Sequence, residues 1–294
     1  MKKILNTFFC TLFFILLASC GTRQFLGFEE KKVRLEGKRI PILGDVVEKN
    51  VISSDTAKII ISKKVENKDW KQSYNSPSHV SINFFSDTTF KKIRRIASGK
   101  GEDKHNKIFA QPIVYKNTIF FMDALTNIIS YDLIKRKVNW RFSAILQNED
   151  NHNIGGGIAL LNNRIIANTP YGEIISLNAK DGSVEWRNNV VSPLRSAPTI
   201  YSDKILSLTV DNRLLVLNND DGKIVWQHEG IFNNTTLIRT PKIAADDNII
   251  IAPYSNGEFY ALNYSNGLVL WKDSLVELES NDISNTFTDI DANP

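Results

Sequence analysis

The chain contains very little cysteine, and histidine is also scarce. Its 294 residues include two cysteines, Cys10 and Cys20, and four histidines. Both cysteines lie within the first twenty residues, so no disulfide is available to the rest of the chain, whose stability must come from a buried core. No histidine is spaced from a cysteine or carboxylate as a metal ligand would be; the four are His79, His105, His152 and His228. The sequence therefore predicts no metal site.

Motifs of the common catalytic sites are missing too. No G-x-S-x-G elbow, Walker sequence or dinucleotide-binding glycine pattern occurs. Three consecutive glycines at 155–157 resemble a phosphate cradle, but they open a predicted strand, which favours close backbone approach instead. Asp181 and Asp221 precede glycines in predicted hairpin turns, where calcium binding is the weaker alternative. We expect no catalytic residue and no cofactor.

Charge of one sign is not in large excess, because 36 Lys and Arg residues face 32 Asp and Glu residues, a net charge of +4. Five basic residues gather shortly after Cys20: Lys31, Lys32, Arg34, Lys38 and Arg39. A solvated linker near anionic lipid headgroups is favoured over a nucleic-acid site. We expect no nucleic-acid partner.

What the chain does contain is a repeated unit. Its clearest copy runs from Ser196 to Trp226 and holds four short runs of alternating apolar residues, at 199–201, 205–208, 214–217 and 224–226. Turn-forming sequences separate the runs, and Gly222 can take the positive φ that a tight turn needs. The pattern predicts four antiparallel strands in one sheet. Such a sheet is too small to bury its own faces.

Three other copies are present, from Ala110 to Trp140, Gly156 to Trp186 and Thr240 to Trp271. The four closing tryptophans are separated by 46, 40 and 45 residues. A period of this length built from four strands is typical of a β-propeller blade, so the predicted fold class is all-β. Each tryptophan would fill the wedge between neighbouring blades. A β-sandwich with chance tryptophan spacing is the alternative.

The first nineteen residues are predicted to be an export signal. Lys2 and Lys3 precede a mostly apolar run that is too short for a confident membrane span and ends in small residues. Residues 17–21, Leu-Ala-Ser-Cys-Gly, resemble the lipobox of bacterial lipoproteins. The resemblance implies that Cys20 becomes the lipidated N-terminus, where several acyl chains anchor better than one. The aspartate that retains many lipoproteins in the inner membrane is missing, which favours the outer membrane. A secreted protein with an incidental cysteine is the alternative.

The remaining chain is expected to form two parts. Residues 20–66 show no repeat pattern and are predicted to be a lipidated tether, and the propeller is expected to span residues 67–294. The last residues, 288–294, resemble the opening of a further unit, like Ser196-Ala197-Pro198. We therefore expect a partial propeller of about four to five blades, truncated at the start of another, since closed propellers have up to about eight. An open arc with an exposed edge is the alternative.

The end of the unit resembles the repeat of pyrroloquinoline-quinone (PQQ)-type propellers, because residues 177–186 and 217–226 both read L-N-x-x-D-G-x-x-x-W. Within that superfamily the chain is similar, over residues 35–294, to the BamB family of outer-membrane assembly lipoproteins. The similarity is carried by the lipobox and by these short sequences: Asp69-Trp70-Lys71-Gln72, Ala110-Gln111-Pro112, Gly155-Gly156-Gly157, Leu194-Arg195-Ser196-Ala197-Pro198, residues 253–258 and Asp289-Ile290-Asp291.

The resemblance implies an eight-bladed propeller, held by its lipid at the periplasmic face of the outer membrane, that serves as a non-catalytic subunit of the β-barrel assembly machinery. Its partner would be the POTRA region of a BamA-type barrel protein, with unfolded outer-membrane proteins as further candidates. In the family a Leu-Arg loop and an acidic D-x-D loop form the contact, although the loop here is shorter. The candidate partner-binding residues are therefore Leu194, Arg195, Asp289 and Asp291.

General physical chemistry supports these candidates. Inter-blade loops are displayed by a rigid scaffold, arginine can bind a carboxylate in a bidentate manner, and leucine can serve as an apolar anchor. An ion pair between Arg195 and Asp291 within the protein is the alternative for these two residues.

Two other functions remain open. A fragment of a PQQ-dependent dehydrogenase would need a vicinal cysteine pair or calcium ligands with a catalytic aspartate, and the disulfide is impossible without a cysteine after Cys20. A sugar-binding propeller would need exposed tryptophans, whereas the repeat already accounts for Trp140, Trp186, Trp226 and Trp271.

Overall fold

The computed structural model describes residues 61–80, 83–85, 95–96, 99–145, 154–232, 241–275 and 290. The chain divides into two units, Met1–Ile60 and Ile61–Pro294, and every described residue belongs to the second. Within these ranges no helix is long and apolar enough to cross a membrane.

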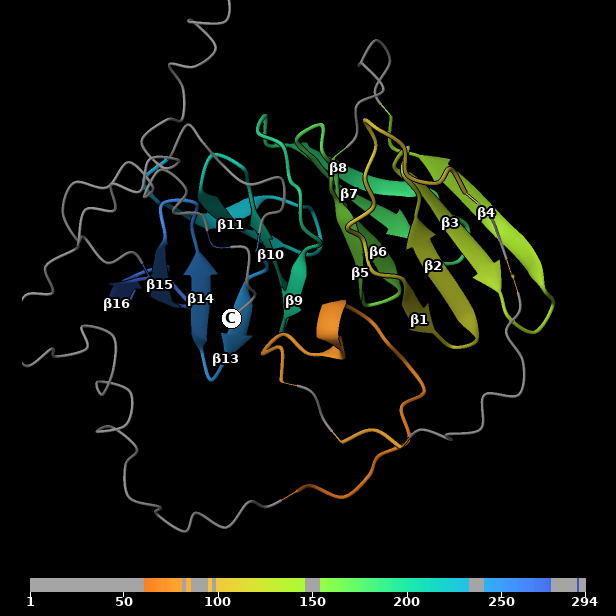
Figure 1. Ribbon diagram of the computed structural model, residues 1–294, viewed down its shortest axis with the longest axis horizontal. Helices are drawn as coiled ribbons and strands as arrows, with labels where there is room; N and C mark the ends of the chain where they lie inside the picture. The colour runs from red at the N-terminus through yellow and green to blue at the C-terminus, as the bar shows by residue number, and fades with distance from the viewer. Residues whose placement is uncertain are drawn as a thin grey trace, which may run out of the picture. The chain divides into compact units, whose positions relative to one another are not determined.

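Four sheets follow one another along the chain, and each contains four consecutive antiparallel strands (Figure 1). The first holds β1 (Ile113–Tyr115), β2 (Thr118–Met122), β3 (Asn127–Asp132) and β4 (Lys137–Ser143). The second holds β5 (Gly157–Leu161), β6 (Arg164–Asn168), β7 (Glu173–Asn178) and β8 (Val184–Asn189). The third holds β9 (Thr199–Tyr201), β10 (Lys204–Leu208), β11 (Arg213–Asn218) and β12 (Ile224–Glu229). The fourth holds β13 (Ala244–Asp246), β14 (Ile249–Pro253), β15 (Glu258–Asn263) and β16 (Val269–Ser274).

Local sequence explains the turns within each sheet. Residues 116–117, 162–163 and 247–248, which join the first two strands of their sheets, all have φ between +43° and +64°. Two consecutive positive φ values match the right-handed twist of a tight hairpin. Before the last strand, Gly182, Gly222 and Gly267 also have positive φ, while Arg136 holds the same position in the first sheet with φ +58°. The predicted turn chemistry is confirmed, with Arg136 as the exception to glycine.

The core lies between successive sheets. Residues of the first and second sheets form one buried apolar cluster, the second and third form another, and the third and fourth a third. The middle strands are therefore buried on both faces; in β7, five consecutive residues are buried. Four separate sheets stacked in this way exclude the β-sandwich alternative and confirm the predicted propeller-type fold.

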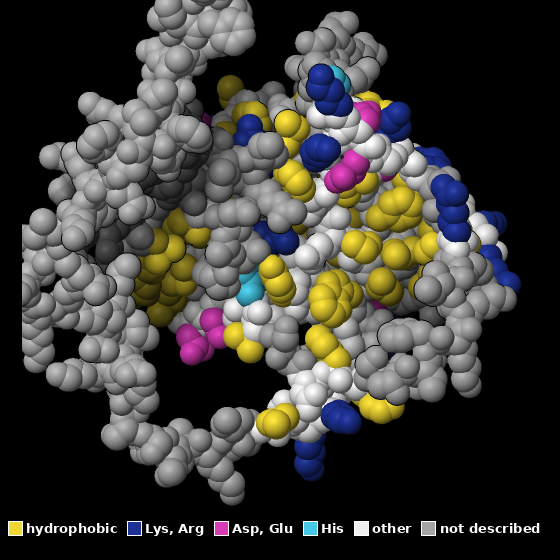
Figure 2. All heavy atoms as spheres, in the orientation of Figure 1, with side chains coloured by type: hydrophobic (Ala, Val, Ile, Leu, Met, Phe, Trp, Pro, Cys, Tyr) yellow, Lys and Arg dark blue, Asp and Glu magenta, His cyan; other side chains and the backbone are white. Residues whose placement is uncertain are grey.

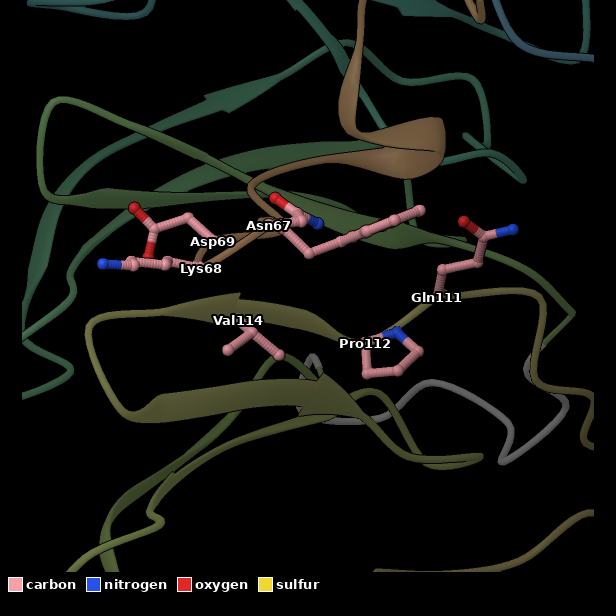
Figure 3. A pocket seen from close by; sticks show the side chains of 7 residues that line it. Asn67, Lys68, Asp69, Gln111, Pro112 and Val114 are labelled. Carbon is pink, nitrogen blue, oxygen red and sulfur yellow. The ribbon is translucent and has the colours of Figure 1, made fainter. Parts of the chain in front are cut away.

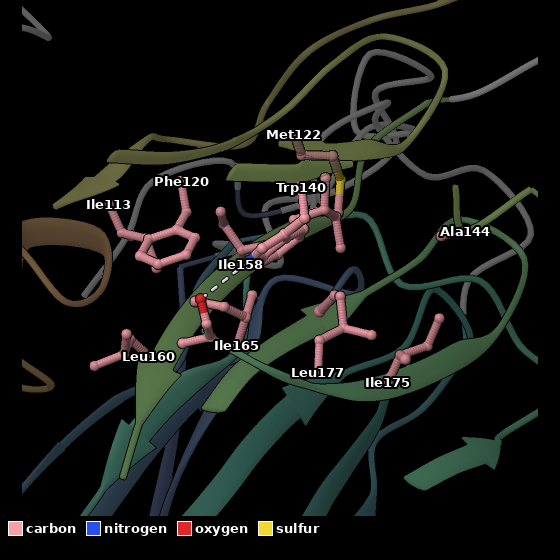
Figure 4. Packing of buried hydrophobic residues seen from close by; sticks show 13 residues of the cluster. Ile113, Phe120, Met122, Trp140, Ala144, Ile158, Leu160, Ile165, Ile175 and Leu177 are labelled. Atoms are coloured by element: carbon pink, nitrogen blue, oxygen red, sulfur yellow. Dashed lines mark hydrogen bonds between the residues drawn. The ribbon is translucent and has the colours of Figure 1, made fainter. Parts of the chain in front are cut away.

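The closing tryptophans join one sheet to the next. Trp140 Nε1 donates a hydrogen bond of 3.1 Å to the Ala179 carbonyl in the turn before β8 (Figure 4). A Cβ atom on Gly182, in the same turn, would lie 2.7 Å from the Trp140 ring. Only glycine permits this approach, because a real side chain would collide with the indole.

The same arrangement is repeated at the next two interfaces. Trp186 Nε1 donates to the Asn219 carbonyl at 2.9 Å, and Trp226 Nε1 donates to the Tyr264 carbonyl at 3.1 Å. The turn glycine is again against the ring, since a Cβ atom on Gly222 would lie 2.4 Å from Trp186 and one on Gly267 2.6 Å from Trp226. A shift of pairing register near each tryptophan, seen in all four sheets, marks a bulge in the last strand.

Trp271 differs from the other three. It packs edge-on against Phe259 of its own sheet, with ring centroids 5.8 Å apart, and remains 48% exposed, whereas Trp140 is 9% exposed. No hydrogen bond from its indole to a turn of another sheet is seen among the described residues, so its place in a wedge between blades stays a prediction.

Outer strands carry charge at their free edges. In the first sheet, exposed basic side chains follow the outer edge: Lys135, Arg136, Lys137 and Arg141. Figure 2 shows Lys and Arg side chains along this rim, beside hydrophobic side chains over the same sheet. Charged edges of this kind discourage pairing with a strand from another molecule.

Candidate functional site

The loop between the second and third sheets, residues 190–198, contains two of the predicted partner-binding residues. It is bonded to a turn of the second sheet, because Val190 N donates to the Gly172 carbonyl at 2.8 Å and Leu194 N to the Thr169 carbonyl at 3.1 Å. The third sheet holds it from the other side, where Val210 N donates to the Pro193 carbonyl at 2.9 Å. The loop is thus fixed by the sheets on both sides.

Within this loop, Leu194 is fully buried and belongs to the apolar cluster between the two sheets. Its side chain has a packing role in this structure and offers no surface to a partner. Arg195 is only partly buried. The sequence placed both residues at an interface, and the structure leaves Arg195 as the one of the two that a partner can reach.

Two of the three glycines at 155–157, Gly155 and Gly157, lie against the same loop. A Cβ atom on Gly155 would lie 2.5 Å from the Arg195 Cα atom, and one on Gly157 would lie 2.5 Å from the Ala197 Cβ atom. Gly155 also has a φ of +106°. The interpretation of these glycines as a place of close backbone approach is confirmed, and the segment that approaches is the Arg195–Ala197 backbone.

Val191, which the sequence did not single out, forms the tip of the loop. It is 84% exposed and has a φ of +68°, a conformation that is a genuine outlier for a β-branched residue. Its amide donates to Asn189 Oδ1 at 2.8 Å, and its carbonyl lies where a side chain on Gly172 would be. Strained, exposed residues of this type are concentrated at binding sites. No sequence pattern distinguishes Val191 from the buried Val190 beside it.

Two ion pairs flank the loop. Arg187 Nη1 lies 3.1 Å from Glu173 Oε2, and Arg213 Nε lies 3.0 Å from Asp211 Oδ2. Arg213 also donates to the Val190 carbonyl at 2.9 Å, which ties the second pair to the loop. The loop therefore presents one apolar tip, Val191, with a charged rim, the pattern of a small protein-binding patch.

Hydrogen bonds keep the rim carboxylate Asp211 ionised. Its partial burial raises its pKa, but hydrogen bonds from Thr209 and Ser192 and the charge of Arg213 outweigh burial, so the pKa is lowered overall. Asp211 lies in the turn between β10 and β11.

The other predicted site residues, Cys20, Asp289 and Asp291, lie outside the described residues. Ile290, between the two aspartates, is described and is buried.

A groove with a volume of about 580 Å³ lies beside β1. Figure 3 shows residues of the 67–70 segment on one side and residues of 111–114 on the other. The lining residues are Asn67, Lys68, Asp69, Trp70, Gln111, Pro112 and Val114. Lys68 and Asp69 are the titratable residues among them. Across the described part of the chain, no three His, Cys, Asp or Glu side chains gather to hold a metal ion.

Successive four-stranded sheets, the first three of which are closed by a tryptophan that docks on a turn of the following sheet, define a propeller-type protein built from PQQ-like repeats. A family model described as outer membrane protein assembly factor BamB matches residues 126–294, more than half of the chain. The chain belongs to this family.

Individual relatives agree with this assignment. An outer membrane protein assembly factor BamB of Nitrosomonas eutropha is 22% identical over 183 residues, which cover 62% of this chain and 43% of the relative. The corresponding protein of Shewanella oneidensis is 23% identical and is 48% covered. An uncharacterized protein of Rickettsia conorii is 30% identical over 169 residues, 56% of this chain and 40% of the relative. The chain thus spans less than half the length of these relatives.

Solved structures share the fold. The crystal structure of BamB from Moraxella catarrhalis superposes with a TM-score of 0.54 at 21% identity, covering 63% of this chain and 54% of that one. A quinohemoprotein alcohol dehydrogenase from Pseudomonas putida HK5 superposes with a TM-score of 0.55 at 12% identity, covering 71% of this chain and 40% of that one. Both likenesses show the propeller fold alone.

Proposed function

We propose that this protein is a non-catalytic scaffold of outer-membrane protein assembly that binds the POTRA region of a BamA-type barrel protein. Family membership supports the assembly role. The loop at 190–198 supports the mode of binding, because it is fixed by hydrogen bonds from two sheets and exposes one strained apolar residue at its tip. A binding loop fixed in advance loses little conformational entropy when its partner docks.

Each residue of the loop has a separate role in this proposal. Val191 is the apolar centre of the contact, and Arg195 beside it pairs with a carboxylate of the partner. Buried Leu194 holds the loop in position. Asp289 and Asp291 are proposed to add an acidic contact from a second loop.

The proposed location is the periplasmic face of the outer membrane. Residues 1–19 would be removed on export, Cys20 would carry the lipid, and residues 20–66 would connect the lipid to the propeller, residues 67–294. A chain anchored in this way meets its barrel partner in the plane of the membrane, which raises the effective concentration of both. Unfolded outer-membrane proteins are proposed as transient further partners.

Co-purification tests the proposal. The tagged, lipidated protein is extracted from membranes in mild detergent, and the proteins that accompany it are identified by mass spectrometry. We expect a POTRA-containing barrel protein in the wild-type sample. Val191→Gly should lower its recovery about ten-fold, since glycine keeps the φ of +68° without strain while the apolar group is lost. Arg195→Glu should lower it similarly through charge reversal.

Lys180→Glu is the matched control, because Lys180 is exposed at the opposite end of the second sheet and the charge change is the same. This variant should recover the partner like the wild type. Folded Val191→Gly and Arg195→Glu variants with undiminished recovery would remove the loop from the interface. A wild-type sample without any barrel protein would remove the assembly function, and PQQ and sugars would then be tested as ligands.

A further inference from the structure

The first strands of the four sheets, β1, β5, β9 and β13, lie in a row (Figure 1). Each pairs with one neighbour in its own sheet, so its other edge is open to a second partner. Four residues occupy the same position in this row, because each is paired with the second residue of the following strand: Val114 with Ile119, Leu160 with Ile165, Ile200 with Ile205 and Ala245 with Ile250.

One short segment, residues 69–77, accepts a hydrogen bond from all four of these amides; we call it the strap. Val114 N donates to the Trp70 carbonyl at 2.7 Å, and Leu160 N donates to the Lys71 carbonyl at 2.7 Å. Ile200 N donates to Gln72 Oε1 at 2.8 Å. Ala245 N donates to the Pro77 carbonyl at 2.9 Å. The strap therefore runs across the open edges of all four sheets in order.

The side chain of Gln72 serves as a peptide group in this row. Its Oε1 accepts from Ile200 N, and its Nε2 donates to the Ile200 carbonyl at 3.2 Å. A neighbouring β-strand would make the same pair of bonds through its main chain. The side chain is buried, so both of its polar ends depend on Ile200.

The strap fits this row imperfectly. After Gln72 it leaves the row through a short 3-10 turn, η1 (Ser73–Asn75), in which Tyr74 has a φ of +58°. Ser73 Oγ is buried without a hydrogen-bond partner among the described residues. Strain in a bulky residue and a buried hydroxyl without a partner both lower the cost of releasing the segment.

We propose that the four amides on the open edges of the first strands form a binding row for an extended polypeptide. In this proposal the strap is a built-in ligand that occupies the row and can be displaced from it. Three of the four acceptors on the strap are main-chain carbonyls, which any extended chain presents. The occupant is therefore recognised by its backbone, as in other cases of strand addition to open sheet edges. The row is separate from the 190–198 loop, so this proposal does not depend on the POTRA partner.

The test loosens the strap and offers a replacement. In the full-length protein, Gln72→Leu removes both bonds to Ile200, and the probe is a fluorescein-labelled synthetic peptide of residues 67–79. We expect the peptide to bind this variant at least ten-fold more tightly than the wild type. Hydrogen exchange at Val114, Leu160, Ile200 and Ala245 should accelerate about ten-fold in the variant and slow again when the peptide is added.

Gln227→Leu is the matched control, since Gln227 lies on the outer strand β12 and bonds only to the nearby Glu229 among the interactions seen here. It should bind the peptide no better than the wild type. If Gln72→Leu does not fold, Gln72→Asn replaces it, because the shorter amide cannot reach both atoms of Ile200. Equal peptide affinity in the wild type and the folded Gln72 variant would overturn the proposal and leave the strap as a fixed part of the fold.

Discussion

Trp140 and Trp271 occupy the same position in the first and the fourth sheet, yet their surroundings differ. The indole of Trp140 lies against the turn of the following sheet and is 9% exposed, whereas that of Trp271 is 48% exposed. Their own sheets pair in the same way, with the same register shift beside the tryptophan. The comparison teaches that each repeat builds its own sheet, while a closing tryptophan is buried where a turn of another sheet lies against it.

The energetic consequence is large. A tryptophan side chain can bury roughly 150–250 Å², and apolar burial stabilises by about 25 cal/mol per Å². A docked tryptophan therefore contributes several kcal/mol to the contact between two sheets, and an undocked one contributes much less. The three docked interfaces should accordingly be the most sensitive points of the fold.

Truncating the two tryptophans tests this contrast most directly. Trp140→Ala should lower the free energy of unfolding by about 3–5 kcal/mol, because it empties a packed interface and leaves the Ala179 carbonyl without its donor. Trp271→Ala should cost less than about 1 kcal/mol. Urea denaturation followed by far-ultraviolet circular dichroism measures both values. Equal losses would show that docking of the tryptophan on the next sheet adds nothing to the free energy of unfolding.

Filling the space beneath a docked tryptophan should have the next largest effect. Gly222→Ala places a methyl group about where the Trp186 ring lies and also disfavours the φ of +68°, so we expect a loss of about 2–4 kcal/mol. Gly101→Ala is the control, since no atom lies within 4 Å of its Cβ position. Thermal unfolding of the two variants should differ by several degrees. A tolerated Gly222→Ala would contradict the requirement for glycine in this turn.

The smallest effect concerns pH and distinguishes the third interface from the other two. His228 of β12 lies 2.7 Å from the Tyr254 hydroxyl of the fourth sheet, and burial lowers the pKa of His228, with Glu229 opposing this. The folded state therefore binds the proton less readily than the unfolded chain. Above the ordinary pKa of 6.5 neither state binds the proton, and the free energy of unfolding has its full value. As the pH falls below 6.5 the unfolded chain binds the proton more readily, and the free energy of unfolding decreases.

Urea midpoints measured between pH 8 and pH 5 check this expectation. The wild type should lose stability over that range, and His228→Gln should show a weaker dependence. The corresponding residues of the first two interfaces are Phe142 and Asn188, which do not titrate in this range. An identical pH dependence in His228→Gln would assign the effect to other groups.

The sequence was sufficient to predict the four sheets because their causes are local. Alternating apolar residues and turn glycines set the strands, and β9 has the predicted bounds, Thr199–Tyr201. The place of Trp140 between sheets could also be predicted, since a repeat with an aromatic closing residue implies a neighbour. The atoms of the next turn that Trp140 contacts could not be predicted, because these contacts depend on how two sheets stack.

The candidate site could be predicted only in part. Arg195 is a candidate through family resemblance, whereas the burial of Leu194 depends on the apolar cluster formed by two sheets together. The positive φ of Val191 has no sequence pattern, because β-branched residues normally avoid it. Gln72 pairs with a residue 128 positions away, and no local pattern reports a bond across that distance.

The long sequence separation between the strap and the strands that it contacts also determines when the strap can dock. During synthesis the strap leaves the ribosome before any of the four sheets, yet its last acceptor, Pro77, must wait for Ala245. Domains fold from the N-terminus as the chain emerges, and contacts between distant residues form late because the intervening loop must first close. The strap is therefore made before the sheets but docks after them, and its last hydrogen bond, to Ala245, forms only when all four sheets are complete.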